Sequence, residues 1–382
     1  MFGISKGMDM KFMIGADTSS LEAMEDQGAR FYDINGEEND AIKVLAAHGV
    51  NFIRLRLFNR PTKSFDGGDY CNLDHTLSMA KRIKAYGLGF MLDFHYSDFW
   101  ADWKSQTIPH DWEKQSADEI ENSVYEYTKN IVKKFIEQGT VPDVVQIGNE
   151  IGKGLLWEYG SLKNPKQITA FLNSGLKAVD ELNIELNEID AEMCTDNNGV
   201  EADAIMSKDN DNSVSIRTML HVECGADTKR TEQFFSELYK EGLREFDYIG
   251  LSYYPYWAGD YSMLINNMKN IDNKFHKEVV VVETAFPYTD ESHDDMPNVV
   301  TGKLTKQSMG LEPSVENQKA VTEKVIKTVK DMPNGAGVFY WEPVWYQVPG
   351  VGVSKGKGNE WENQAMFDNQ GHALESLKAF GK

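Results

Sequence analysis

The stretch DAIKVLAAHGVNFIRLRL (40–57) contains the unit from which the fold can be predicted. Its first part, 40–49, has apolar residues at helical spacing and ends in Gly49, a residue typical of the position after a helix. Its second part, 51–57, is a short apolar run typical of a buried parallel strand. A helix, a glycine and a strand in this order are half of a repeating α/β unit.

The same unit recurs along the chain. Helix-like segments at 77–87 and 123–139 also end in glycine and are also followed by apolar runs. Eight such runs are expected as strands, namely 12–17, 51–57, 89–96, 144–150, 218–225, 248–255, 279–286 and 337–343. They predict an α/β protein with one (β/α)8 TIM barrel over residues 1–382 and extended βα loops. A doubly wound open sheet is the rival, but no GxGxxG motif follows an early strand.

One connection interrupts the regular spacing. It holds a helix over 165–183 and then an acidic insertion at about 181–213. The Asp and Asn residues of the insertion could bind Ca²⁺. Their spacing differs from that of an EF-hand loop, so a solvated surface segment is the preferred interpretation.

Charge and composition exclude several classes of protein. The chain has 382 residues, with 39 Lys and Arg against 60 Asp and Glu, and a net charge of −21. Nucleic acids and anionic membranes are therefore poor partners, whereas a neutral substrate is compatible. Three dispersed cysteines form no CxxC motif and are expected to be reduced and structural.

The compartment stays open at this point. The chain start lacks the apolar segment of a signal peptide, and no run of 18 apolar residues could span a membrane. We expect a cytoplasmic protein for the chain as given, or a secreted one if a signal has been removed.

Polar side chains gather at the ends of the expected strands. In a barrel, the carboxyl ends of the strands share one mouth, where active sites are built. The residues at these ends are Asp17, Arg56, His95, Glu150, Glu223, Tyr254, Glu283 and Glu342.

Two of these residues suggest a chemistry. Glu150 follows Asn149 after the fourth strand, and Glu283 follows four valines in the seventh. Two carboxyl groups across a cleft are what glycoside hydrolysis requires, one protonated and one ionised. The alternatives are a helix cap beside a surface acid for Glu150, and a structural ion pair with Arg54 or Arg56 for Glu283.

Aromatic residues are concentrated around the same expected mouth. Their faces can pack against the apolar faces of sugar rings. They are Phe99, Trp100, Trp103, Trp157, Tyr253, Tyr254, Tyr256, Trp257, Trp341 and Trp345. No metal, nucleophile-elbow or phosphate-loop motif offers a competing site.

Together these motifs resemble the endo-β-1,4-galactanases of glycoside hydrolase family 53. The similarity extends from Gly15 to Asp368. It is carried by MLDFHYSDFWAD (91–102), VVQIGNEIGKGLLW (144–157), GLSYYPYW (250–257), VVVVETAFPYT (279–289), GVFYWEP (337–343) and WENQAMFD (361–368). Trp103 stands where the family commonly has Pro.

The resemblance implies roles for individual residues. Glu150 would be the general acid/base and Glu283 the nucleophile of a retaining mechanism. Asn149 would contact the sugar 2-hydroxyl, and Arg54 would keep Glu283 ionised. The other expected substrate-binding residues are His95, Tyr254 and Trp341, with Asp17, Trp100 and Trp257 as weaker candidates.

The resemblance also implies a substrate and leaves two alternatives. The expected reaction is internal cleavage of β-1,4-galactan by a monomer that requires no cofactor. Some bacterial members carry Ca²⁺ in the loop after strand seven, but TDESHDDMPN (289–298) does not match their spacing. The alternatives are another retaining β-glycanase, such as a mannanase or glucanase, and a galactan-binding protein without activity.

Overall fold

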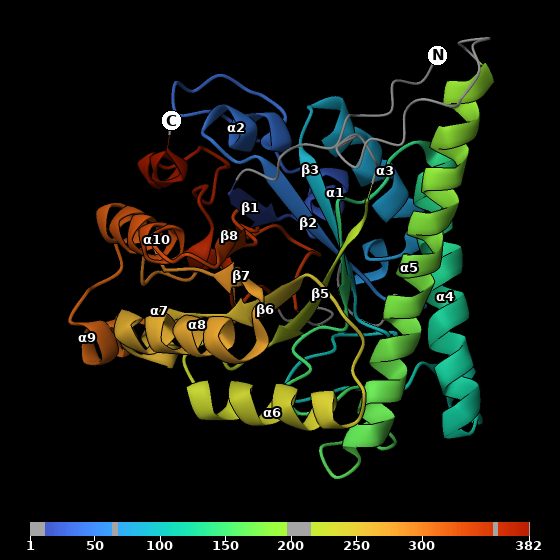
Figure 1. The fold of residues 1–382 in the computed structure, drawn as a ribbon. Coiled ribbons are helices and arrows are strands. Elements are labelled where there is room, and N and C mark those ends of the chain that lie inside the picture. Colours follow the sequence, from blue (N-terminus) through green and yellow to red (C-terminus); the bar gives the residue numbers. More distant parts are fainter. Residues whose placement is uncertain (1–11, 63–67, 197–214, 354–357, 382) are drawn as a thin grey trace.

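The computed structural model describes residues 12–62, 68–196, 215–353 and 358–381, with the backbone alone for 189–196. Eight parallel strands form a closed barrel in chain order (Figure 1). All eight strands were predicted from the sequence. They are β1 (Met13–Asp17), β2 (Phe52–Leu57), β3 (Gly89–Phe94), β4 (Val144–Ile147), β5 (Arg217–Val222), β6 (Tyr248–Ser252), β7 (Glu278–Thr284) and β8 (Gly335–Trp341).

Helices surround this barrel on its outer face (Figure 1). They are α1 (Leu21–Asp26), α2 (Ala41–Ala47), α3 (Leu73–Ala85), α4 (Ala117–Gln138), α5 (Pro165–Asp196), α6 (Thr228–Lys240), α7 (Pro255–Ala258), α8 (Tyr261–Phe275), α9 (Gly302–Met309) and α10 (Val315–Lys330). Short 3-10 helices occur at Gly68–Tyr70, His110–Trp112, Glu362–Gln364 and Glu375–Phe380. No helix in the described ranges is long and apolar enough to cross a membrane.

Three helices differ from the prediction at one end. α3 begins at Leu73 rather than at residue 77, because the Asn72 side chain caps it. α4 begins at Ala117 rather than near residue 123, because Ser116 and Glu119 form a capping box. α5 continues to Asp196 and so takes in the start of the acidic insertion. Leu186, beyond the predicted end of this helix, still packs against the core. The rest of the insertion lies outside the described residues.

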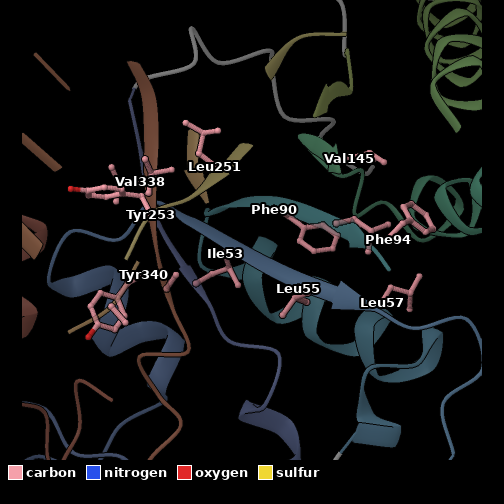
Figure 2. Close-up of a cluster of buried hydrophobic side chains, with 14 of the residues drawn as sticks. Ile53, Leu55, Leu57, Phe90, Phe94, Val145, Leu251, Tyr253, Val338 and Tyr340 are labelled. Carbon is pink, nitrogen blue, oxygen red and sulfur yellow. The ribbon is translucent and has the colours of Figure 1, made fainter. Parts of the chain in front are cut away.

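One apolar core lies outside the barrel, between the strands and the helices, and a second lies inside the barrel. Ile53, Leu55 and Leu57 of β2 belong to the large apolar cluster that also contains Phe90 and Phe94 of β3 (Figure 2). Of the three cysteines, Cys71 and Cys224 are buried and form no disulfide in the described residues, and the side chain of Cys194 lies outside those residues.

The barrel interior has an apolar floor and a polar layer above it. Phe52 and Phe339 belong to the floor cluster. Gly15 makes room there, because a Cβ atom on it would lie 2.1 Å from the Phe339 ring. Arg54 lies two residues after Phe52 on β2. It is buried and donates hydrogen bonds to Gln146 of β4 and Asp93 of β3. Because side chains alternate along a strand, Phe52 and Arg54 both point into the barrel, and the charged residue lies nearer its mouth.

Candidate active site

A cleft of about 430 Å³ opens at the carboxyl ends of the strands. Glu150 and Glu283 both line it, and their side chains are largely buried. A carboxylate oxygen of Glu150 lies within 4.8 Å of one of Glu283. The two carboxyl groups of retaining glycosidases lie about 5–5.5 Å apart, and those of inverting enzymes about 6.5–9.5 Å apart. The geometry therefore fits retention.

Each carboxylate oxygen of Glu150 accepts a hydrogen bond. The Ser252 hydroxyl donates to Oε1 at 2.7 Å, and the backbone N–H of Trp103 lies 3.4 Å from Oε2. The backbone of Glu150 has a φ of 48°, in the left-handed region. Such a conformation is costly outside glycine and is common at functional sites. Burial and the nearby charge of Glu283 raise the pKa of Glu150 well above its ordinary value, which favours the protonated acid.

Glu283 receives two hydrogen bonds. Arg54 Nη1 donates to Oε1 and the Tyr254 hydroxyl donates to Oε2, each at 3.1 Å. The expected contact between Arg54 and Glu283 is thus present. Burial raises the pKa of Glu283 to about 7, although the Arg54 charge opposes this shift. Arg54 therefore limits the pKa rise and does not reverse it.

Arg54 occupies the centre of a buried network. All five of its N–H groups have acceptors, so the guanidinium has a single orientation. The acceptors are Gln146, Asp17, Glu283, Asp93 and Asn149, at 2.8 to 3.1 Å. This network fixes the position of Glu283 from below the cleft.

Asn149 and His95 are oriented by backbone atoms of one loop. Asn149 donates to the Ala101 carbonyl at 2.8 Å, and the Ala101 N–H donates to His95 Nδ1 at 3.0 Å. His95 Nε2 therefore carries the ring proton and lies 3.1 Å from Asp93. Asn149 and His95 both line the cleft, where the sequence placed them.

Four tryptophans form a row along the cleft. Ring centroids are 6.2 Å apart for Trp100 and Trp341, 4.7 Å for Trp341 and Trp361, and 6.1 Å for Trp361 and Trp257. The first two and Trp257 were predicted to bind substrate. Phe99, Trp103 and Trp345 also line the cleft, whereas Trp157, Tyr253 and Tyr256 are not among its lining residues.

Asp17 was predicted to bind substrate, but the structure places it elsewhere. Its side chain is fully buried and is not among the residues that line the cleft. It pairs with Arg54 and Arg56, each at 3.1 Å. Arg56 also pairs with Glu342 at 2.5 Å, so it is not the partner of Glu283. Because strand ends converge beneath the cleft, these charges support the site from below.

The structure adds residues that sequence reasoning did not select for the site. They are Asp93, Gln146, His221, Ser252 and Trp361. Polar residues inside apolar strands are a signal that could have identified the first three. Burial lowers the pKa of His221 well below its ordinary value, so its ring stays neutral 2.9 Å from Ser252.

The loop at 289–298 is held by backbone hydrogen bonds. Asp290 accepts from the N–H of Gly302, and Asp294 accepts from those of Met296 and Asn359, at 2.6 to 2.7 Å. Among the described residues, the close cluster of possible metal ligands is Glu150, His221 and Glu283, and no residue of this loop belongs to such a cluster.

Fold and site together define a class of protein. Two buried carboxyl groups with different partners at the mouth of a (β/α)8 barrel are the arrangement that a glycosidase requires. The sequence profile of "Glycosyl hydrolase family 53" matches residues 13–380, and the chain belongs to this family.

Individual relatives agree with this assignment. The chain is 31% identical to "Endo-beta-1,4-galactanase" of Bacillus subtilis, over 98% of this chain and 86% of that protein. It is 31% identical to "Arabinogalactan endo-beta-1,4-galactanase" of Thermothelomyces thermophilus, over 96% of this chain and 98% of that protein. The solved "Ignisphaera aggregans GH53 catalytic domain" superposes with a TM-score of 0.85 at 32% identity, covering 100% of this chain and 98% of that one.

Proposed function

We propose that this glycosidase cleaves β-1,4-galactosidic bonds inside galactan chains, with retention of configuration. The observation that carries the proposal is the pair Glu150 and Glu283, within 4.8 Å of each other and with different partners. The family and the names of the relatives support galactan as the substrate.

The reaction follows from the two environments. Glu283, ionised beside Arg54 and Tyr254, attacks the anomeric carbon, while Glu150 protonates the departing glycosidic oxygen. Glu150, now ionised, then takes a proton from water, whose oxygen attacks the same carbon and releases Glu283. These residues supply the acid, the base and the nucleophile, so the scheme requires no cofactor. All of them come from one chain, so the reaction needs no residue of a second subunit.

The test is product analysis on linear β-1,4-galactan. The wild type should release short galacto-oligosaccharides whose first-formed anomer is β by proton NMR. Glu150→Gln and Glu283→Gln should lose activity by at least about a thousandfold. Hydrolysis of mannan or glucan but not galactan would favour another β-glycanase, and binding without turnover would favour a binding protein. Full activity in either variant would contradict the assigned roles.

A further inference from the structure

Trp103 lies in the cleft but outside the row of tryptophans. Its side chain is 43% exposed, in contrast to buried Trp345. It lines the cleft in the loop after β3. In the described residues, the recorded ring contacts of Trp103 are with the ammonium groups of Lys104 and Lys153, 4.9 and 4.7 Å from the ring centroid. The indole is therefore partly exposed at the cleft, with two ammonium groups near its ring.

The position of Trp103 relative to Glu150 decides which part of the substrate it can reach. The backbone N–H of Trp103 lies 3.4 Å from Glu150 Oε2, and Lys153, whose ammonium group lies near the indole ring, follows Glu150 by three residues. Glu283 is instead contacted by Arg54 and Tyr254. The acid of a retaining glycosidase faces the oxygen that leaves, so groups on its side lie near the departing chain.

We infer that Trp103 forms a binding site for a galactose unit on the leaving-group side, and this inference rests on the proposed function. The indole offers its exposed surface to the apolar face of the sugar. Lys104 and Lys153 act as positioning residues, because their cation–π contacts restrict the indole. Trp103 therefore helps to determine how well a departing or incoming galactan chain is bound.

Transfer of a galactobiosyl group to added galactobiose measures binding on the leaving-group side separately from binding in the rest of the cleft. β-Galactobiosyl fluoride forms the Glu283 intermediate with a leaving group that occupies no sugar site. Added galactobiose then binds on the leaving-group side. Because fluoride leaves as an anion, Glu150 first releases its own proton to solvent. The galactobiose hydroxyl oxygen then attacks the anomeric carbon, its proton passes to ionised Glu150, and the bond to Glu283 breaks. The ratio of transfer to hydrolysis measures binding at this side alone.

Trp103→Ala should lower the ratio of transfer to hydrolysis by about three- to tenfold at a fixed galactobiose concentration. Any change in fluoride release without galactobiose should be smaller than the change in this ratio. Trp103→Phe should retain most of the transfer, and Lys153→Met should lose part of it. Tyr86→Ala removes an equally exposed ring, 39% exposed, at the opposite end of the barrel, and should change neither quantity.

Two outcomes would overturn the inference. One is an unchanged transfer ratio in Trp103→Ala, and the other is a loss of fluoride release as large as the loss of transfer. If Trp103→Ala does not fold, Trp103→Phe and Lys153→Met decide between the same outcomes. A wild type that releases no fluoride would instead contradict the proposed function.

Discussion

The different environments of Glu150 and Glu283 determine the pH range of activity. The pKa of Glu283 is raised to about 7, so protonation of the nucleophile should reduce kcat/KM as the pH falls through that value. Loss of the Glu150 proton should reduce kcat/KM at higher pH, because its pKa is raised well above the ordinary value. A pH profile on galacto-oligosaccharides tests both limbs. With β-galactobiosyl fluoride, which needs no acid, the alkaline limb should disappear, and its persistence would contradict the role of Glu150.

Tyr254 gives a second prediction at the same scale. Its hydroxyl donates to Glu283 Oε2 at 3.1 Å and stabilises the ionised form. Tyr254→Phe should therefore raise the pKa of Glu283, move the acidic limb to higher pH and lower kcat/KM at pH 6 by about tenfold. Tyr253→Phe is the matched control, because that hydroxyl donates to the Gly259 carbonyl. An unshifted acidic limb in Tyr254→Phe would show that the hydroxyl does not stabilise the nucleophile.

Individual residues also show what the sequence could and could not reveal. Glu150, Glu283 and the contact with Arg54 were predictable, because charged groups at the ends of apolar strands need partners. The five acceptors of Arg54 were not predictable, because they depend on the register of β1, β2, β3, β4 and β7 and on the turn after β4. Trp361 begins the WENQAMFD stretch that carries part of the resemblance, but no expected strand end lies next to it, because it reaches the cleft from the segment after β8.

At the scale of elements, strands were easier to predict than helix ends. Buried parallel strands are continuous apolar runs, which are visible in the sequence. Helix ends depend on capping and on contacts between helices. The SADE motif at 116–119 marks the start of α4, whereas the apolar pattern alone predicts a start near residue 123.

This capping box gives a stability prediction. The Ser116 side chain accepts from the Glu119 N–H, and the Glu119 carboxylate accepts from the Ser116 N–H. Ser116→Ala should lower the free energy of unfolding by about 1 kcal/mol, measured by urea denaturation. Ser308→Ala, which removes a hydroxyl inside the short helix α9, should cost less than about 0.5 kcal/mol. Equal effects of the two changes would argue against a capping contribution.

At the scale of the whole molecule, the loop at 289–298 joins the β7 side of the mouth to the segment after β8. Asp294 accepts from the Asn359 N–H, and Glu362 accepts from the His293 N–H. Because these carboxylates already have backbone donors, we expect EDTA to leave the Tm unchanged in calorimetry. A fall of several degrees that added Ca²⁺ reverses would instead identify a calcium site.

The active site should also cost the molecule stability as the pH rises. The pKa of Glu283 is about 7 in the folded chain, above its ordinary value of 4.5. The folded state therefore binds more protons than the unfolded state between these values, and the free energy of unfolding falls as the pH increases through them. Glu283→Gln removes this titration. Relative to the wild type, the variant should gain stability between pH 4 and pH 8, on the order of a few kcal/mol.

Urea denaturation at a series of pH values tests this difference. Glu278→Gln is the matched control, because Glu278 lies at the exposed start of the same strand, β7. That change should leave the pH dependence of the wild type intact. A difference between Glu283→Gln and wild type that does not vary with pH would contradict the raised pKa. The expected result would show that the nucleophile is kept in its place at the expense of folding stability, because burial disfavours the charge that catalysis needs.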